Sequence, residues 1–312
     1  MSEVTSKKEE INNSLSSNDV LKITTFNVAS LRASWNKGLP FYVKSIQPDI
    51  LCIQETKMHS SAKPSVEEFK IEGYHAYFLH ADKKGYAGTA IYTKVKPISV
   101  KPSEGVTDPN GRCITMEFSK FYLVNSYVVN AGQNGTPNLK YKINEFNPQI
   151  EAHLENLRKK KAVIWTGDLN VAHQDIDIWT TEGLSNVAGF TKEERDWFDS
   201  FLKKGYIDIF RDLYPTKQQF TFFDFRGGSR AKNQGWRIDY FIINKEAKKD
   251  GLIIDCFIDS AIDISDHLPV NLLLKRSMIL TEGKDLPVKG MSVKVIEKQN
   301  NSSTLDSFFS KK

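Results

Sequence analysis

From Leu21 onward the chain alternates short apolar runs with polar turns, and each run has the length and the β-branched or aromatic content of a strand. The runs expected to form strands are LKITTFNVA, DILCIQ, YHAYFLHA, GTAIYT, CITMEF, FYLVNSYVV, AVIWTG, FTFFDF, WRIDYFIIN, LIIDCFI and LPVNLLLK. Many neighbouring runs are linked too tightly for a helical crossover, which favours mixed or antiparallel sheets. The pattern therefore predicts an α/β protein with more strands than helices.

Helical periodicity is confined to a few segments between these runs. It predicts helices near Leu39 to Ile46, around Ile143 to Lys161, where Pro148 starts or kinks the helix, and from Thr191 to Lys203. The last of these begins with T-x-x-E, a capping box in which two side chains satisfy free backbone donors. Since the helices are few and separated by strands, we expect them to pack outside the sheets.

Composition changes this picture mainly at the two ends of the chain. With 312 residues and 40% hydrophobic content, the chain can bury a large core, as one α/β domain or two smaller ones. Residues 1–20 are polar and are expected to be disordered, residues 21–276 to be globular, and residues 277–312 to form a flexible tail. The N-terminal segment lacks the apolar region of a secretion signal, and no run is long enough to span a membrane.

Cysteine use and net charge add two further expectations. Cys52, Cys113 and Cys256 are far apart in apolar runs, which is typical of core thiols in an intracellular, reducing compartment. Lys and Arg number 43 against 38 Asp and Glu, a formal charge of +5. This excess suits a polyanionic partner but does not require one.

Polar side chains recur where the apolar runs end. AVIWTGDLNVAHQDIDI shows the pattern, since a buried run stops at Gly167 and delivers a carboxylate. The residues placed in this way are Asn27, Glu55, Tyr127, Asn130, Asp168, Asn170, Asp239, Asp266 and His267. A single Asp or Asn at a strand end is usually a turn former or a cap. Together they form an oxygen-rich set with one imidazole, which suits Mg²⁺ and phosphoryl chemistry.

The order of these motifs resembles that of the exonuclease III class of apurinic/apyrimidinic endonucleases, within the wider endonuclease/exonuclease/phosphatase superfamily. The segments that carry the resemblance are FNVASLRASWNKGL, PDILCIQETK, GYAGTAIYTK, NSYVVNAG, WTGDLNVAHQDIDI, NVAGFTKEER, GWRIDYF and SDHLPV. QET and SDHLP occur throughout the superfamily, whereas GDLNVAH with GWRIDYF is close to diagnostic. The resemblance implies a four-layer α/β sandwich of the DNase I-like kind, two mixed sheets face to face with helices outside.

The resemblance also implies roles for the polar residues. Glu55 would be the main Mg²⁺ ligand, with Mn²⁺ as a substitute, and Asp168 would orient or deprotonate the attacking water. Asn170 and Tyr127 would hold the phosphate, and His267, oriented by Asp239, would contact a phosphate oxygen. The full set expected near the metal is Asn27, Glu55, Asp168, Asn170, Asp266 and His267.

On the substrate side, Phe222 and Trp236 would surround a base-less sugar flipped from the duplex, although aromatic residues in such runs are equally often plain core. The basic loop RGGSRAKNQG would contact DNA phosphates through Arg230, Lys232 and Asn233. The residues Asn130 and Gln133, after the Tyr127 strand, complete the expected DNA contacts.

The implied activity is Mg²⁺-dependent hydrolysis of the phosphodiester 5′ to an abasic site by a monomer, with 3′-phosphodiesterase and 3′–5′ exonuclease side activities. Two alternatives stay open: a phosphatase acting on inositol lipids or nucleotides, and a catalytically inactive scaffold. The chain departs from the family pattern at Ala29, where many members have Asp, and at Gln133, where mammalian members have Arg.

The C-terminal stretch NSSTLDSFFSKK lies beyond the catalytic motifs. Leu305, Phe308 and Phe309 would share one side of a helical or 3₁₀ turn, the arrangement of a short anchor that enters an apolar groove. Residues 302–309 resemble the peptide that binds the sliding clamp PCNA, with Ser302 where that motif has Gln. The alternative is that these side chains fold back onto the enzyme. Clamp binding would fit a nuclear location.

Overall fold

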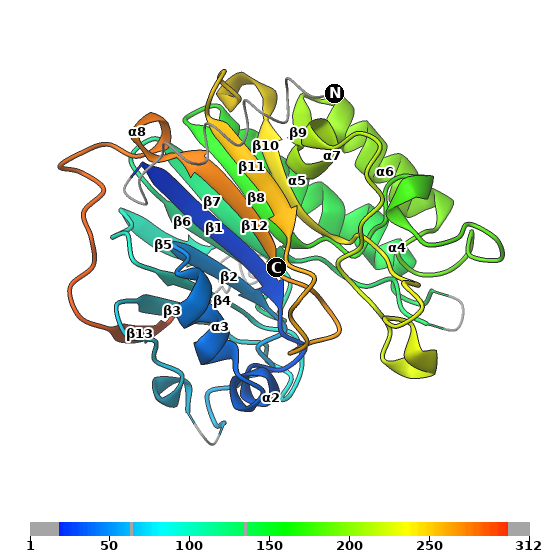
Figure 1. Cartoon of the computed structure of the whole chain (residues 1–312), viewed down its shortest axis with the longest axis horizontal. Coiled ribbons are helices and arrows are strands. Elements are labelled where there is room, and N and C mark those ends of the chain that lie inside the picture. The colour runs from blue at the N-terminus through cyan, green and yellow to red at the C-terminus, as the bar shows by residue number, and fades with distance from the viewer. Residues whose placement is uncertain (1–18, 63–64, 134–135, 299–312) are drawn as a thin grey trace, which may run out of the picture.

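The computed structural model describes residues 19–62, 65–133 and 136–298, and within them two mixed sheets dominate (Figure 1). One is a seven-stranded sheet in the described chain, in the order β11 (Ile253–Ile258), β12 (Val270–Lys275), β1 (Val20–Asn27), β2 (Ile50–Gln54), β4 (Thr89–Thr93), β3 (His75–Leu79) and β13 (Ser292–Val295). The other has six strands among the described residues, in the order β5 (Ser99–Pro102), β6 (Cys113–Glu117), β7 (Phe121–Tyr127), β8 (Ala162–Asp168), β10 (Asp239–Asn244) and β9 (Tyr206–Asp208).

Helices cover the outer face of each sheet. The α-helices are α2 (Leu31–Asn36), α3 (Leu39–Ile46), α4 (Leu139–Tyr141), α5 (Asn147–Arg158), α6 (Lys192–Lys203), α7 (Ile209–Leu213) and α8 (Arg276–Ile279). Short turns of other types are η1 (Val66–Glu68), the π-turn η2 (Lys142–Phe146), η3 (Asp175–Asp177), η4 (Arg226–Gly228) and η5 (Lys245–Ala247). None of the described helices is long and apolar enough to cross a membrane.

Three buried apolar clusters hold these layers together. The largest lies between the two sheets and contains side chains of both, such as Ile23 and Ile164. A second packs the outer face of the β7–β8 sheet against α5 and α6, and a third packs the outer face of the β1–β2 sheet against α2 and α3. Figure 1 shows α5 and α6 on one side of the sandwich and α3 on the other. The predicted four-layer sandwich is confirmed.

Most of the expected strands and all of the expected helices are present, as are the buried free cysteines. The T-x-x-E capping box forms as predicted, because the Thr191 hydroxyl accepts a hydrogen bond from the backbone N–H of Glu194, and the Glu194 carboxylate accepts one from the backbone N–H of Thr191. Helix α5 begins at Asn147, with Pro148 in its first turn, where the missing N–H of proline costs nothing.

The prediction of a strand at FTFFDF is wrong. This segment pairs only through isolated bridges from Phe222 to Trp236 and to His267, so it is an extended loop over the sheet edge. The segment can lie this close to residue 235 only because that residue is glycine, since a Cβ at Gly235 would lie 2.5 Å from the Phe223 ring. Strands β5, β9 and β13 were missed because they are short or only half-buried and lack a continuous apolar run.

Residues 277–298 are not the flexible tail that the sequence led us to expect. After α8 the chain runs along the edge of the molecule and returns as β13, which pairs in parallel with β3 (Figure 1). Buried Ile279 and Leu280 join the core between the sheets, and Ser119 bonds Asp285. The apolar positions are too widely spaced to stand out in the sequence. Residues 1–18 and the proposed clamp-binding stretch lie outside the described residues.

Candidate active site

The polar strand ends meet at one edge of the sandwich because of how the strands run. β1 and β2 are parallel, as are β7 and β8, so the ends that carry Asn27, Tyr127 and Asp168 face the same edge. β10 runs antiparallel to β8 and β12 antiparallel to β1, so their beginnings reach that edge too. Asp239 consequently lies directly opposite Asp168 in the β10–β8 register.

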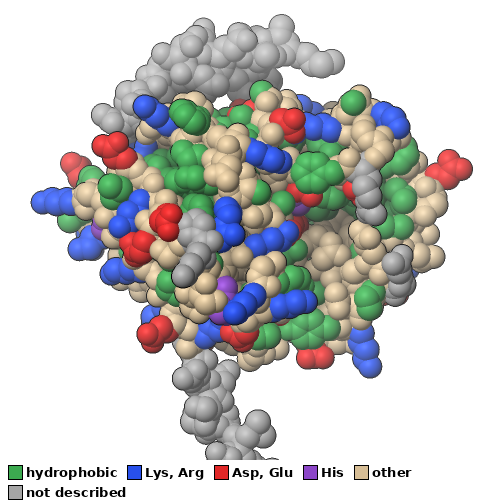
Figure 2. Space-filling view, turned by 90° about the horizontal axis from the view of Figure 1, so that it is seen from below, with side chains coloured by type: hydrophobic (Ala, Val, Ile, Leu, Met, Phe, Trp, Pro, Cys, Tyr) green, Lys and Arg blue, Asp and Glu red, His purple; other side chains and the backbone are tan. Residues whose placement is uncertain are grey.

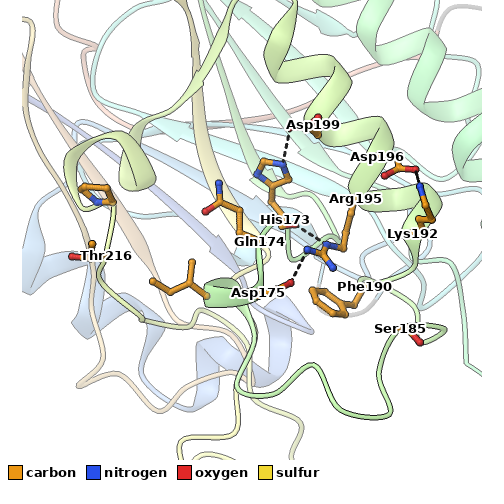
Figure 3. A pocket seen from close by; sticks show the side chains of 12 residues that line it. His173, Gln174, Asp175, Ser185, Phe190, Lys192, Arg195, Asp196, Asp199 and Thr216 are labelled. Carbon is orange, nitrogen blue, oxygen red and sulfur yellow. Dashed lines mark hydrogen bonds and ion pairs between the residues drawn. The ribbon is translucent and has the colours of Figure 1, made fainter.

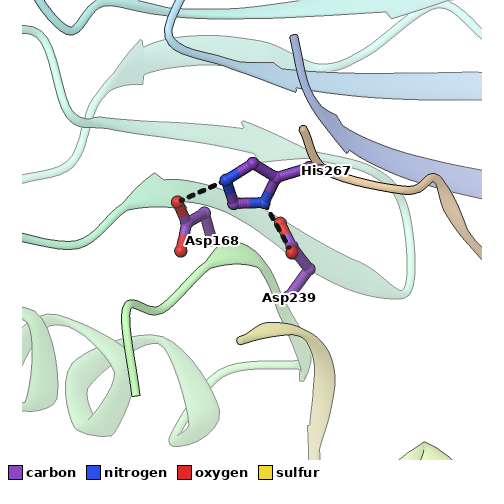
Figure 4. A group of neighbouring side chains, drawn as sticks. All are labelled: Asp168, Asp239 and His267. Atoms are coloured by element: carbon purple, nitrogen blue, oxygen red, sulfur yellow. Dashed lines mark hydrogen bonds and ion pairs between the residues drawn. The ribbon is translucent and has the colours of Figure 1, made fainter. Parts of the chain in front are cut away.

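His267 is held between two buried carboxylates (Figure 4). Its Nδ1 lies 2.9 Å from Asp239 Oδ2, and its Nε2 lies 3.8 Å from Asp168 Oδ2. Burial alone would lower the pKa of His267, but the charge of Asp239 and its hydrogen bond raise it to about 10. Because both ring nitrogens face carboxylates, the arrangement suits a charged imidazolium; the ligand atoms of His267, Asp168 and Asp239 also lie within 4.8 Å of one another, close enough for the three side chains to hold a metal ion.

Asp168 lies at the centre of the cluster and is 1% exposed. Burial raises the pKa of its carboxyl to about 7, although His267 opposes the shift. A group with a pKa near neutrality is well suited to take a proton from water. Asn27 Nδ2 donates to Asp168 Oδ2 at 2.8 Å and the backbone N–H of Asn170 donates to Oδ1 at 2.9 Å, so both oxygens are oriented.

Glu55 and Asp168 converge on one amide group. Asn27 Nδ2 donates to both carboxylates, at 3.1 Å to Glu55 Oε1 and 2.8 Å to Asp168 Oδ2. Lys57 lies 3.0 Å from the other oxygen of Glu55; burial would raise the pKa of that carboxyl, but Lys57 and Asn27 lower it. Two carboxylates this close, with Asp266 on the same cavity, form an oxygen donor set that fits a hard divalent cation.

Asn170, Tyr127 and Asn130 also line the cavity. Asn130 Nδ2 donates to Asn170 Oδ1 at 2.8 Å, and Asn170 Nδ2 donates to the carbonyl of Val128 at 2.9 Å. Tyr127 is 8% exposed, and burial together with Glu55 and Asp168 raises the pKa of its phenol well above its ordinary value, so the hydroxyl keeps its proton. These groups offer donors to an anionic oxygen.

The backbone at the end of β8 tolerates no side chain before Asp168. Gly167 has φ +129°, and a Cβ there would lie 2.0 Å from the carbonyl oxygen of Ser126 on β7. Asn170 and Glu55 have φ +50° and +52°, the left-handed region that residues other than glycine rarely adopt. Such strain is typical of sites where the backbone must aim particular side chains.

A cavity of about 490 Å³ opens beside the cluster. Most of the sequence-predicted residues line it: Glu55, Tyr127, Asn130, Gln133, Asp168, Asn170, Phe222, Trp236, Asp266 and His267. Asn27 and Asp239 are not part of this lining, but they contact residues that are, since Asn27 donates to Asp168 and Asp239 bonds His267. Phe222 packs against His267, with ring centroids 4.9 Å apart, so this aromatic residue belongs to the site.

Sequence reasoning missed part of the cavity wall, including Val187, Asp224 and Ile238. Ile238 could have been found, because it lies two residues after Trp236 and alternate residues of an extended segment share a face. Val187 stands in NVAGFTKEER, one of the segments that carry the family resemblance, although that segment gave it no role. Asp224 carries no comparable signal, since it comes from an irregular loop whose path depends on tertiary contacts.

The basic loop is positioned differently from the cavity wall. Arg230 pairs with Asp263 at 2.7 Å and donates to the carbonyl of Ser260, and it lies outside the cavity lining, as do Lys232 and Asn233. Lys37 lies over the ring of Phe225, which is 64% exposed. Figure 2 views the molecule from this side and shows a hollow with Lys and Arg side chains on the surface beside it.

A second, larger hollow of about 840 Å³ lies by His173, also within the GDLNVAH motif (Figure 3). Its basic side chains are paired, Arg195 with Asp175 and Lys192 with Asp196. His173 lies 3.7 Å from Asp199. Since each cation in it has an acidic partner, this hollow is poorly suited to hold phosphate.

The profile of the Endonuclease/Exonuclease/phosphatase family matches residues 24–267, from β1 to His267. The chain belongs to this family. Among curated members, it is 41% identical over 258 residues to a DNA-(apurinic or apyrimidinic site) endonuclease of Dictyostelium discoideum, covering 81% of this chain and 70% of that protein. It is 37% identical to an exodeoxyribonuclease of Bacillus subtilis, covering 81% and 99%.

Solved structures of the family agree. The AP endonuclease of Leishmania major has a TM-score of 0.78 at 29% identity, over 85% of this chain and 90% of that one. The 3′–5′ exonuclease NExo of Neisseria meningitidis has a TM-score of 0.72 at 27% identity, over 81% and 99%. The resemblance of this family member to the exonuclease III class is thereby confirmed, and so is its DNase I-like fold.

Proposed function

We propose that this protein is a DNA repair nuclease that hydrolyses the phosphodiester 5′ to an abasic site and leaves a 3′-hydroxyl. The observation that carries the proposal is the Asp168–His267–Asp239 cluster, which opens into a cavity with the apolar wall Phe222, Trp236 and Ile238. A base-less sugar suits such a wall, whereas the polyol of an inositol headgroup would leave hydroxyls unpaired against it. Secondary 3′-phosphodiesterase and 3′–5′ exonuclease activities are part of the proposal.

In the proposed mechanism Asp168 accepts a proton from the attacking water, for which its position and its pKa near 7 are suited. His267, charged and held by Asp239, donates to a phosphate oxygen, while Asn170 and Tyr127 stabilise the developing charge. Mg²⁺, the cation we propose, would supply Lewis-acid stabilisation of the phosphate and would be held by Glu55, with Asn27 and Asp266 nearby.

The test is incision of a duplex with one tetrahydrofuran abasic analogue, with and without EDTA. We expect a single cut 5′ to the analogue, loss of cutting in EDTA, and recovery with Mg²⁺ or Mn²⁺. Hydrolysis of inositol phosphates or nucleotides without incision of this duplex would favour the phosphatase alternative. A folded protein without either activity would favour the scaffold.

Ala29 provides a prediction about the metal. Its backbone N–H donates to Asn27 Oδ1 at 2.9 Å, so this residue contacts a side chain that we expect near the cation, but its own methyl group offers no oxygen. Ala29→Asp should shift the Mg²⁺ titration of incision to lower concentration and leave turnover at saturating Mg²⁺ little changed, because a carboxylate strengthens binding of a hard cation. Ala29→Asn is the uncharged control, and an unmoved titration for the Asp variant would contradict the assignment.

For the C-terminal stretch we propose binding to a sliding clamp through Leu305, Phe308 and Phe309, which would place the enzyme at replication sites in the nucleus. The support is the sequence motif alone. Calorimetry with a peptide of residues 299–312 and the homologous clamp should show binding, weakened by the Gln that is missing at Ser302. The double variant Phe308→Ala/Phe309→Ala should abolish the heat; equal heat from both peptides would disprove the tether.

A further inference from the structure

Lys142 is a buried cation that the mechanism above does not use. It begins the π-turn η2, and its side chain is 1% exposed. Lysine is almost never fully buried unless it is paired, and π-turns inserted between α-helices occur often at functional sites. Both features call for a specific reason at this position.

The amine of Lys142 makes two contacts, and one of them is with the site. Nζ donates to Glu194 Oε1 at 2.6 Å and to the backbone carbonyl of Asn170 at 2.7 Å. Asn170 is the residue in the left-handed conformation whose side chain faces the cavity. The hydrogen bond from Lys142 to the Asn170 carbonyl therefore holds the backbone of Asn170 in its strained conformation, next to the side-chain amide that we expect to bind phosphate.

Glu194, the partner of Lys142, also holds a second part of the cavity wall in place. Its second oxygen accepts hydrogen bonds from the backbone N–H of Gly189 at 2.8 Å and from Thr191 Oγ1 at 2.8 Å. Gly189 lines the cavity, and a Cβ there would lie 3.5 Å from the Trp236 ring and 3.6 Å from the Asn170 carbonyl. One buried ion pair thus connects the Asn170 turn with the loop beside Trp236.

An ion pair is a costly way to fill this space. Burial lowers the pKa of Lys142, and the charge of Glu194, its hydrogen bond and the charge of Asp168 offset only part of that shift. Well-packed apolar residues often replace a buried pair without loss of stability, so stability alone does not account for it. The directional contacts with Asn170 and Gly189 are what apolar side chains would fail to supply.

We propose that Lys142 and Glu194 are positioning residues for phosphodiester hydrolysis, which lock Asn170 and the Gly189 wall in the geometry that the reaction needs. This inference rests on the proposed function. Displacement of a catalytic group by about 1 Å can cost on the order of 100-fold in rate. Loss of the pair should therefore reduce kcat much more than it changes KM.

The test compares variants of the full-length chain in single-turnover and steady-state incision of abasic duplex. Lys142→Met/Glu194→Gln removes both charges without leaving one unpaired, and Gln keeps an acceptor for Gly189. We expect kcat about 10- to 100-fold lower, with KM within about threefold of the native value. Lys142→Arg, which keeps the charge and a donor, should retain most of the native kcat. Lys142→Leu/Glu194→Gln, which likewise leaves no unpaired charge, serves if the first double variant does not fold.

Lys161→Met is the matched control, because it breaks the ion pair of Lys161 with Glu117 at the opposite end of β8. Amide hydrogen exchange provides a readout independent of activity: Asn170 and Gly189 should exchange faster in the double variant and not in the control. A native kcat in a folded pair variant, an equal loss in Lys161→Met, or unchanged exchange would overturn the inference. Absence of incision by the native enzyme would instead contradict the proposed function, and exchange would still decide the positioning role.

Discussion

Asp168→Asn is expected to lower single-turnover incision by about 100- to 10,000-fold, the usual cost of losing a general base. Asn keeps the shape of the carboxylate, so it can still accept the hydrogen bond from the backbone of Asn170. It cannot take a proton from water, and it removes the negative charge that faces His267 Nε2. The measurement is rapid-quench cleavage of abasic duplex at saturating enzyme and Mg²⁺.

Asp175→Asn is the control for this substitution, since Asp175 follows in the same segment but is exposed and pairs with Arg195. It should cleave at close to the native rate. Near-native cleavage by Asp168→Asn would exclude Asp168 as the water-activating group. A comparable loss in both variants would point to disturbed folding of the segment rather than to lost chemistry.

Asp239→Asn should lower kcat on the order of 100-fold, because His267 loses the partner that holds it charged and oriented. The carboxylate binds His267 Nδ1 through Oδ2, and its other oxygen has no hydrogen-bond partner among the described residues. An amide of the same shape preserves packing but no longer opposes the effect of burial, which lowers the pKa of the imidazole. Asp212→Asn, at an exposed ion pair with Lys248, is the control.

The pH dependence distinguishes this role from a structural one. The pKa of His267 in the folded protein, about 10, lies above its ordinary value of 6.5, so the charged pair adds stability fully below about pH 6.5. That stability is lost as the pH rises through about 10. Native incision should fall over the same alkaline range, and the fall should move to lower pH in Asp239→Asn. An alkaline limb at the same pH in both proteins would show that His267 does not need its charge.

Much of this site was readable from the sequence because its residues stand at strand ends. A run such as AVIWTGD indicates both where a strand ends and which side chain stands at that end. Parallel strands in one sheet bring such ends to the same edge. Gly167, Asp168 and Asn170 were therefore identifiable as a group. The capping box of α6 was equally local, since Thr191 and Glu194 are three residues apart and need no distant partner.

Tertiary structure alone decided what depends on partners far along the chain. Arg230 is of a type that often binds phosphate, yet in the folded protein it forms an ion pair with Asp263. The FTFFDF run has strand composition, but it lies over the sheet edge where the ladder has ended. β13 has only four residues and a half-exposed pattern, and only the free edge of β3 makes it a strand.

Glu194 has one role that the sequence determined and another that only the tertiary structure decided. The sequence determined its role as a helix cap, because that role is fixed by spacing. Its ion pair with Lys142, 52 positions away, arises only when the helices close over β8 and leave both charges without water. Local patterns thus determined which side chains reach the catalytic edge, while long-range packing decided how they are held, because burial and pairing depend on neighbours that no local pattern contains.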